Sequence, residues 1–244
     1  MESFKITIAD VSFEVQPLFA STKDYCGKYL TDTLSNYYIS VSPDDLIAEQ
    51  KMLDIEALEE GIKLRKFSEP FLERAVIQRK IANILLDHHT LLMHGSTVGL
   101  DGSAYLFTAA CGTGKSTHTR FWREFFGERA IMVNDDKPFL KIVNDQVIAY
   151  GSPWSGKHGL DQNVALPLKG ICILHRGENN EIIPIDPNEV VDMIRHQCLM
   201  PGDTELSDSA IMLVDQLLAN IPLWKMYCTK DPDAARISHE AMSR

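Results

Sequence analysis

The 244-residue sequence predicts an α/β protein built around a phosphate-binding loop. Three observations predict this fold class: an apolar strand pattern at 103–108, the run GTGKS at 112–116, and a second apolar strand at 130–133 that two acids closely follow. A strand, a glycine-containing turn and a helix start form the context in which such a loop binds phosphate. We therefore expect a P-loop domain over 67–244, preceded by a small α+β region over 1–66.

The composition is that of a folded protein with an excess of acidic side chains. Hydrophobic residues make up 45% of the chain, charged residues make up 24%, and the formal net charge is −10. This charge argues against nucleic acid or an anionic membrane as the main partner. No apolar run approaches the roughly 20 residues of a membrane-spanning helix, and the first residues alternate like a strand rather than form a signal peptide. Five scattered cysteines lack metal-binding spacing, so we expect reduced thiols and a cytoplasmic location.

The N-terminal region predicts small, half-buried elements and contains no catalytic pattern. Residues 4–9 and 12–16 alternate apolar and polar side chains, which predicts a hairpin. A short helix over 21–30 and a third strand at 37–41 follow. A capping serine at Ser42, a proline and two acids then begin a helix that extends to about residue 60. We interpret this region as a packing element or as one that presents a substrate.

A long helix and a hairpin lead into the phosphate-binding loop. Residues 70–87 keep apolar side chains at helical spacing. Residues 91–100 predict a strand that ends at Asp101-Gly102, a dipeptide typical of a two-residue hairpin turn. The strand at 103–108 would then pair antiparallel with its predecessor. We therefore expect a mixed sheet, unlike the all-parallel sheet of most P-loop proteins.

The loop from Ala109 to Ser116 has the residue types that phosphate binding needs. Its backbone N–H groups point at one spot, and the N-terminus of the following helix, expected over 117–126, adds positive potential there. Lys115 would reach the terminal phosphates, and the hydroxyl of Ser116 would take one Mg²⁺ position. Ala109 replaces the first glycine of the usual pattern and fits if its φ is negative. The expected nucleotide-binding residues are Cys111, Gly112, Thr113, Gly114, Lys115, Ser116 and Thr117.

Two adjacent acids, Asp135 and Asp136, follow the strand at 130–133. Ligands collect at the carboxyl ends of strands in open α/β sheets. The twenty positions from Lys115 to Asp135 accommodate a three-turn helix, a turn and a return strand. Beside a bound triphosphate, one carboxylate can hold the metal and the other can take a proton from an acceptor hydroxyl. The alternative is an ordinary surface turn.

Further candidate residues lie elsewhere along the chain. A loop over 151–159 contains three glycines, a proline, a tryptophan and Lys157, which can stabilise the transferred phosphate or simply be solvated. His118 lies one turn into the helix and can approach phosphate or solvent. Arg176 follows a strand at 168–174 and can contact phosphate, an acidic substrate or a surface carboxylate. The remaining expected elements are strands at 182–185 and 222–228 and helices over 187–199, 207–218 and from 231 onward.

The order His94-Gly95, then GTGKS, then Asn134-Asp135-Asp136 resembles the HPr kinase/phosphorylase family, whose nucleotide fold is shared with phosphoenolpyruvate carboxykinase. The resemblance covers roughly residues 70–200. It implies transfer of phosphate from ATP to a hydroxyl, commonly that of serine. It also implies that Lys115 grips phosphate, that Ser116 and Asp136 serve Mg²⁺, and that Asp135 is the base with His94 nearby. The downstream HPr-kinase signature is not recognisable, so neither HPr as substrate nor the reverse phosphorolysis is implied.

These observations favour an ATP- and Mg²⁺-dependent phosphotransferase with Asp135, His94, Lys115 and Lys157 as its catalytic residues. His94 can tune the neighbouring acid or be purely structural. The acceptor hydroxyl can belong to a peptide, a protein or a small molecule, and the donor can be ATP, GTP or pyrophosphate. The family resemblance leans towards a homo-oligomer. The alternatives are a non-catalytic ATP-binding regulator and, with no paired-lysine motif to support it, a carboxykinase-like lyase.

Overall fold

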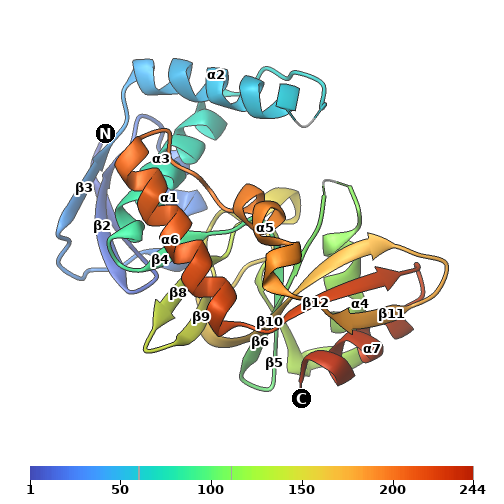
Figure 1. Cartoon of the computed structure of the whole chain (residues 1–244). Helices are drawn as coiled ribbons and strands as arrows, with labels where there is room; N and C mark the ends of the chain where they lie inside the picture. The colour runs from blue at the N-terminus through green and yellow to red at the C-terminus, as the bar shows by residue number, and fades with distance from the viewer. Residues whose placement is uncertain (60, 111, 244) are drawn as a thin grey trace. The chain divides into compact units, whose positions relative to one another are not determined.

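The computed structural model describes residues 1–59, 61–110 and 112–243 (Figure 1). The chain divides into two compact units, Met1–Ile84 and Leu85–Arg244. It is an α/β protein with a curled, mixed sheet, as the sequence predicts. Helix α3 (Glu69–Leu86) lies mostly within the first unit, whereas we expected it to begin the second one.

The first unit contains a three-stranded sheet and three helices. Strands β1 and β2 form the predicted antiparallel hairpin, and β3 pairs with β2 in parallel. The helix expected over 21–30 is shorter and gives way to a 3₁₀ turn, Gly27–Tyr29. The other elements of the unit are β1 (Phe4–Ile8), β2 (Val11–Gln16), α1 (Ser21–Tyr25), β3 (Tyr37–Ser40) and α2 (Pro43–Glu59).

Buried charges explain why α3 belongs to the first unit. Glu73 on α3 is fully buried and accepts hydrogen bonds from the backbone N–H of Phe19 and the hydroxyl of Thr22. Arg79, two turns further along α3, donates to Glu49 of α2 at 2.9 Å. A buried charge is tolerated only when it is paired and hydrogen-bonded. These long-range partners tie α3 to the N-terminal elements.

The second unit is built on a nine-stranded mixed sheet. Seven of its strands follow the order β4-β8-β9-β10-β6-β5-β7, and of the other two, β12 pairs with β10 and β11 pairs with β12. The twelve-residue β10 joins the two parts of the sheet because its first residues pair antiparallel with β9 and its later ones pair parallel with β6 and β12. The strands are β4 (Thr90–Leu92), β5 (Ser96–Leu100), β6 (Ser103–Thr108), β7 (Ala130–Asn134), β8 (Phe139–Val143), β9 (Gln146–Tyr150), β10 (Ala165–Arg176), β11 (Glu181–Pro184) and β12 (Leu223–Cys228). The helices are α4 (Lys115–Phe126), α5 (Val191–Gln197), α6 (Thr204–Asn220) and α7 (Asp233–Met242).

The single strand expected over 91–100 is wrong, because two strands occupy this range. β4 pairs with β8, a strand that we did not predict, and β5 pairs with β6 and β7. At the break, the backbone N–H of His94 donates to the carbonyl of Gln197 at 2.7 Å, and that of Gly95 donates to the carbonyl of Asp136 at 3.0 Å. A Cβ atom at Gly95 would lie 2.9 Å from a side-chain atom of Leu106, so the chain approaches β6 closely here.

The predicted hairpin turn after β5 is confirmed. Asp101 has φ 49° and Gly102 has φ 80°, both in the left-handed region that a primed two-residue turn requires. The turn brings β6 back antiparallel to β5 with Leu100 opposite Ser103. The loop between β6 and α4 therefore begins at the edge of the sheet where β5 starts.

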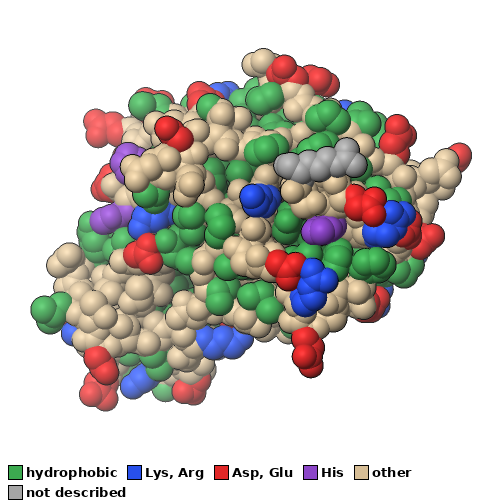
Figure 2. All heavy atoms as spheres, turned by 90° about the horizontal axis from the view of Figure 1, so that it is seen from below, with side chains coloured by type: hydrophobic (Ala, Val, Ile, Leu, Met, Phe, Trp, Pro, Cys, Tyr) green, Lys and Arg blue, Asp and Glu red, His purple; other side chains and the backbone are tan. Residues whose placement is uncertain are grey.

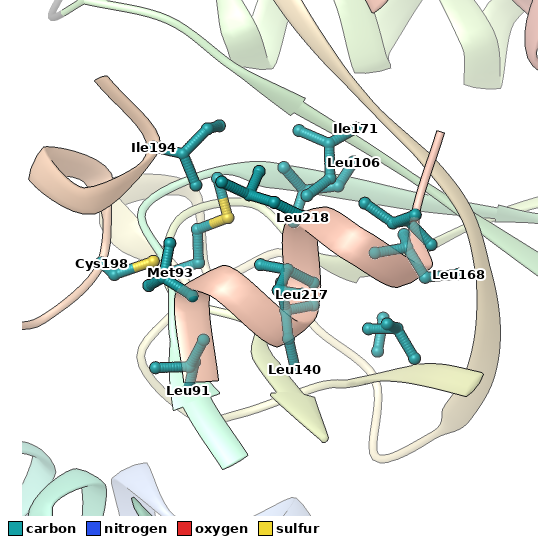
Figure 3. Packing of buried hydrophobic residues seen from close by; sticks show 14 of the residues in the cluster. Leu91, Met93, Leu106, Leu140, Leu168, Ile171, Ile194, Cys198, Leu217 and Leu218 are labelled. Atoms are coloured by element: carbon teal, nitrogen blue, oxygen red, sulfur yellow. The ribbon is translucent and has the colours of Figure 1, made fainter. Parts of the chain in front are cut away.

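Helices cover the sheet of the second unit with two hydrophobic clusters. In the first cluster, Leu217 and Leu218 of α6 pack with strand residues such as Leu106, Leu140 and Ile171 (Figure 3). In the second, α4 packs against α7, and buried aromatic side chains of β6 contact those of α4. This packing fixes the start of α4 relative to the ends of the neighbouring strands.

The surface carries charges of both signs. Acidic and basic side chains lie interspersed among hydrophobic ones on the face that Figure 2 shows. The cysteines Cys26, Cys172, Cys198 and Cys228 carry free thiols. Of the helices that the structure describes, none is long and apolar enough to cross a lipid bilayer.

Candidate functional site

Four segments of the second unit end or begin at one edge of its sheet. β5 lies between β6 and β7 and is antiparallel to both, so the start of β5 lies beside the carboxyl ends of the other two strands. β10 runs parallel to β6 and ends at the same edge. The loop after β6, the acids after β7, the histidine before β5 and the arginine that ends β10 are therefore brought together. Ligands of α/β proteins bind at such edges.

The loop between β6 and α4 owes its shape to two glycines. Gly112 has φ 73° and Gly114 has φ 121°, and neither would bring a Cβ atom closer than 4.0 Å to another atom. The backbone conformation, rather than crowding, therefore requires glycine. Ala109 is buried and has no positive φ, so an alanine fits where the usual pattern has glycine. Cys111 lies outside the residues that the structure describes.

The start of α4 is open to a ligand. Gly114 precedes the first helical residue, so no side chain there caps the N–H groups of the first turn. Ser116 and Thr117 are exposed on this turn. The amino group of Lys115 reaches back to the carbonyl oxygen of Ala109 at 3.2 Å. An uncapped helix start with a lysine beside it is a ready binding site for an anion.

Arg176 binds the loop itself. Its Nη2 donates a hydrogen bond to the carbonyl oxygen of Gly112 at 2.8 Å. This contact differs from the surface ion pair that we considered, and it places a positive charge beside the loop. Thr113 closes the loop from within, because its backbone N–H donates to the carbonyl of Ala110 at 3.2 Å.

His94 and Asp136 form a half-buried pair, with 3.2 Å between Nε2 and Oδ1. Burial lowers the pKa of His94 more than Asp136 raises it, and the positive charges of Lys137 and Lys115 lower it further. Burial alone would raise the pKa of Asp136, but the hydrogen bond from His94 and the charge of Lys137 bring it below the usual value. At neutral pH a neutral imidazole therefore donates to an ionised carboxylate.

Asp135 has different surroundings. It is 7% exposed, and its Oδ1 accepts a hydrogen bond from Ser96 at 2.7 Å. Ser96 in turn lies 2.8 Å from the hydroxyl of Thr119 on α4. The two adjacent acids thus face different partners, one a histidine at the open edge and the other a pair of buried hydroxyls.

Asn134 shapes the turn that holds both acids. Its side-chain oxygen accepts from the backbone N–H of Asp136 at 2.8 Å and of Lys137 at 2.6 Å, which is an Asx turn. Its amide nitrogen donates to the carbonyl of Ser152 at 2.8 Å. The turn is therefore anchored to the loop that follows β9.

The loop over 151–159 passes close to Asp136. A Cβ atom at Gly151 would lie 1.8 Å from the carbonyl oxygen of Gln162, so only glycine fits there. A Cβ atom at Gly156 would lie 3.2 Å from the Cβ of Asp136. Lys157 follows in the 3₁₀ turn Gly156–His158 and is exposed. Lys157 therefore follows a residue whose backbone lies close to Asp136.

His118 does not face the site, so the expectation that it approaches phosphate or solvent is wrong. Its side chain is 2% exposed and lies between α4 and α7, with Nε2 at 3.1 Å from the hydroxyl of Ser238. The indole N–H of Trp122 also points at this nitrogen. Burial lowers the pKa of His118 to about 3, so the ring is neutral.

Sequence reasoning missed several residues that build this site. Thr108, at the end of β6, donates to the carbonyl oxygen of His94 at 2.9 Å, and Gln197 of α5 accepts the backbone N–H of the same histidine. Ser96 and Thr119 support Asp135. Their partners lie from 14 to 103 residues away in the sequence, so no local pattern could identify them.

No known family description matches the sequence, and no curated protein is similar enough to count as a relative. Among solved structures, the Hpr(Ser) kinase/phosphatase from Coxiella burnetii matches 52% of this chain and 87% of its own. The sequence identity is 16% and the TM-score is 0.31. A likeness of this size does not identify the activity of the chain.

Proposed function

We propose that this protein is an ATP-dependent phosphotransferase that moves the γ-phosphate to a hydroxyl group. One observation carries the proposal: the glycines and helix start that follow β6 and the acids Asp135 and Asp136 that follow β7 come from two different strands and lie at one edge of the sheet. A phosphate-binding loop facing a carboxylate pair is the arrangement that phosphoryl transfer requires.

The residues of the loop fit a nucleotide. The uncapped first turn of α4 and the backbone of Gly112 and Gly114 offer N–H groups to the phosphates. Lys115 and Arg176 add positive charge beside them. The exposed hydroxyl of Ser116 and a nearby carboxylate are the oxygen ligands that Mg²⁺ prefers, and the ion would supply neutralisation of phosphate charge.

The surroundings of the two acids favour the opposite assignment to the one implied by the family resemblance. Asp136 is the more open of the two and is held by His94, so we assign to it the acceptor hydroxyl and its proton. Asp135 is buried and connects through the hydroxyl of Ser96 to Thr119 of α4, so we assign it to the metal side together with Ser116. We assign to Lys157, which follows Gly156, a contact with the acceptor or the transferred phosphate; what supports this is that a Cβ atom at Gly156 would lie 3.2 Å from the Cβ of Asp136.

The direct test is transfer of label from γ-labelled ATP, with Mg²⁺, to serine peptides, free serine and small alcohols. We expect label to appear in at least one acceptor class. Asp136→Asn should abolish the transfer and retain ATP binding, whereas Asp135→Asn should remove the response of binding to Mg²⁺. If Asp136→Asn transfers label at the normal rate, Asp136 is not the base.

The same experiment separates the alternatives. A non-catalytic regulator would be favoured if the protein binds ATP but transfers no label to serine peptides, free serine or small alcohols. GTP and pyrophosphate offered as donors would show whether the site reads the base or only the phosphates. The loop itself contacts phosphate through backbone groups, which do not distinguish the bases.

A further inference from the structure

A chain of buried hydroxyls connects Asp135 with Thr119, which lies on α4 just after its first turn. Ser96 is the first residue of β5 and is fully buried, and Thr119 lies on the buried side of α4. The distances are 2.7 Å from Ser96 to Asp135 and 2.8 Å from Ser96 to Thr119. Ser96 on β5 thus bridges Asp135, which directly follows β7, and Thr119 on α4.

The direction of the hydrogen bonds follows from counting protons. Ser96 donates its single hydroxyl proton to Oδ1 of Asp135. Thr119 must then donate its own proton to Ser96. Thr119 Oγ1 also lies 3.4 Å from the carbonyl oxygens of Lys115 and Ser116, a longer contact that competes weakly for the same proton. Both hydroxyls are therefore polarised towards Asp135.

We propose that Ser96 and Thr119 are positioning residues that hold Asp135 in register with the first turn of α4, so that the phosphate-binding turn and the metal-side carboxylate are set together. The inference rests on the proposed function, because it gives Asp135 a part in binding the magnesium form of the nucleotide. Hydrogen bonds to charged groups are among the stronger ones in proteins, and their loss leaves a buried carboxylate poorly satisfied.

A neighbouring residue provides a matched control. Thr97 is the next residue on β5 and is also fully buried, but its hydroxyl makes no hydrogen bond within the part of the chain that the structure describes. Thr119→Val and Thr97→Val remove one hydroxyl each at nearly constant volume. Thr119→Ser keeps the hydroxyl and loses only a methyl group.

The experiment is calorimetric titration of the full chain with ATP, once with Mg²⁺ and once with a chelator. We expect Thr119→Val and Ser96→Ala each to weaken the Mg²⁺-dependent affinity about tenfold, and the double variant to be little worse than either single one, because both remove the same connection. Binding without Mg²⁺ should change little. Thr119→Ser and Thr97→Val should bind like the wild type.

Two kinds of failure are distinguishable. If the wild type binds Mg²⁺-ATP and Thr119→Val binds it equally well, the positioning role is wrong and the proposed function stands. If the wild type does not bind, or does not respond to Mg²⁺, the proposed function falls and takes this inference with it. Circular dichroism of each variant confirms folding, and should Ser96→Ala fail to fold, Thr119→Val against Thr97→Val decides alone.

Discussion

His94 and His118 are both histidines whose pKa is lowered by burial, yet their surroundings give them different parts. His118 is closed in between α4 and α7, and its polar partners Ser238 and Trp122 are themselves buried. His94 is half-exposed and faces Asp136 at the open edge of the sheet. A lowered pKa alone therefore does not distinguish a candidate functional residue from a residue of the core, because burial lowers the pKa of both histidines.

We expect the largest effect in the open region, which comprises the loop before α4 and the pair His94 and Asp136. Asp136→Asn should lower phosphate transfer by about 10²–10⁴-fold, because an amide cannot act as a base, although its oxygen can still accept the hydrogen bond from His94. Initial rates with labelled ATP measure the loss. Asp145→Asn, in the exposed turn between β8 and β9, is the control that changes charge equally. Equal losses of transfer rate in both variants would mean that Asp136 has no specific role in the transfer.

In the closed region, which surrounds His118 between α4 and α7, substitutions should instead lower the free energy of unfolding. Trp122 is fully buried between β6 and α7, so Trp122→Ala should lower the free energy of unfolding by about 3–5 kcal/mol. Phe125→Ala, on the exposed side of the same helix, should cost far less. Urea unfolding measures both values. The folded Trp122→Ala protein should still bind ATP, and a selective loss of binding would contradict the division into two regions.

The pH dependence of stability should separate the two histidines. The folded pKa of His118 is about 3 and the unfolded value is about 6.5, so stability is fully present above pH 6.5 and is lost as the pH falls towards 3. Between pH 6.5 and pH 4 the loss from this group is at most about 3 kcal/mol. His118→Gln should flatten the measured curve of unfolding free energy against pH more than His94→Gln does. The reverse order would mean that His118 is solvated.

Arg176 should give the smallest effect. Arg176→Gln removes the charge beside the loop and weakens the contact with Gly112, so pyrophosphate binding should fall about 3- to 10-fold. Arg176→Lys should recover part of the loss if the charge matters. Arg129→Gln changes net charge equally, but Arg129 pairs with Asp101 at the hairpin turn at the far end of β6. Calorimetry that shows the same decrease for both arginines would indicate a general charge effect.

Much of the open region could be predicted from the sequence because its main features are local. The strand, the glycines and the helix start of the loop are consecutive, as are the strand and the acids that follow it. The hairpin at Asp101-Gly102 also depends on two adjacent residues. These short-range patterns sufficed for the α/β class and for the mixed sheet.

The remainder depends on partners that are distant in sequence. The break at His94 could not be seen because the apolar residues on both sides of it fit a single strand, and the backbone N–H of His94 bonds instead to the carbonyl of Gln197, 103 residues away. His118 looked available because polar residues surround it in the sequence, but Ser238 covers it from 120 residues away. The different surroundings of Asp135 and Asp136 likewise depend on Ser96 and His94. The hydrophobic periodicity of the sequence does not indicate which distant side chains form such pairs.

The claim that the loop and the acids form one nucleotide site is tested most directly by calorimetric titration. The wild type and Lys115→Ala are each titrated with ATP and with pyrophosphate, with and without Mg²⁺. We predict binding by the wild type that Mg²⁺ strengthens, and a loss of about 100-fold or more in Lys115→Ala, since a charged phosphate contact is removed. Absence of binding in the wild type, or equal affinity in the two proteins, would contradict the claim.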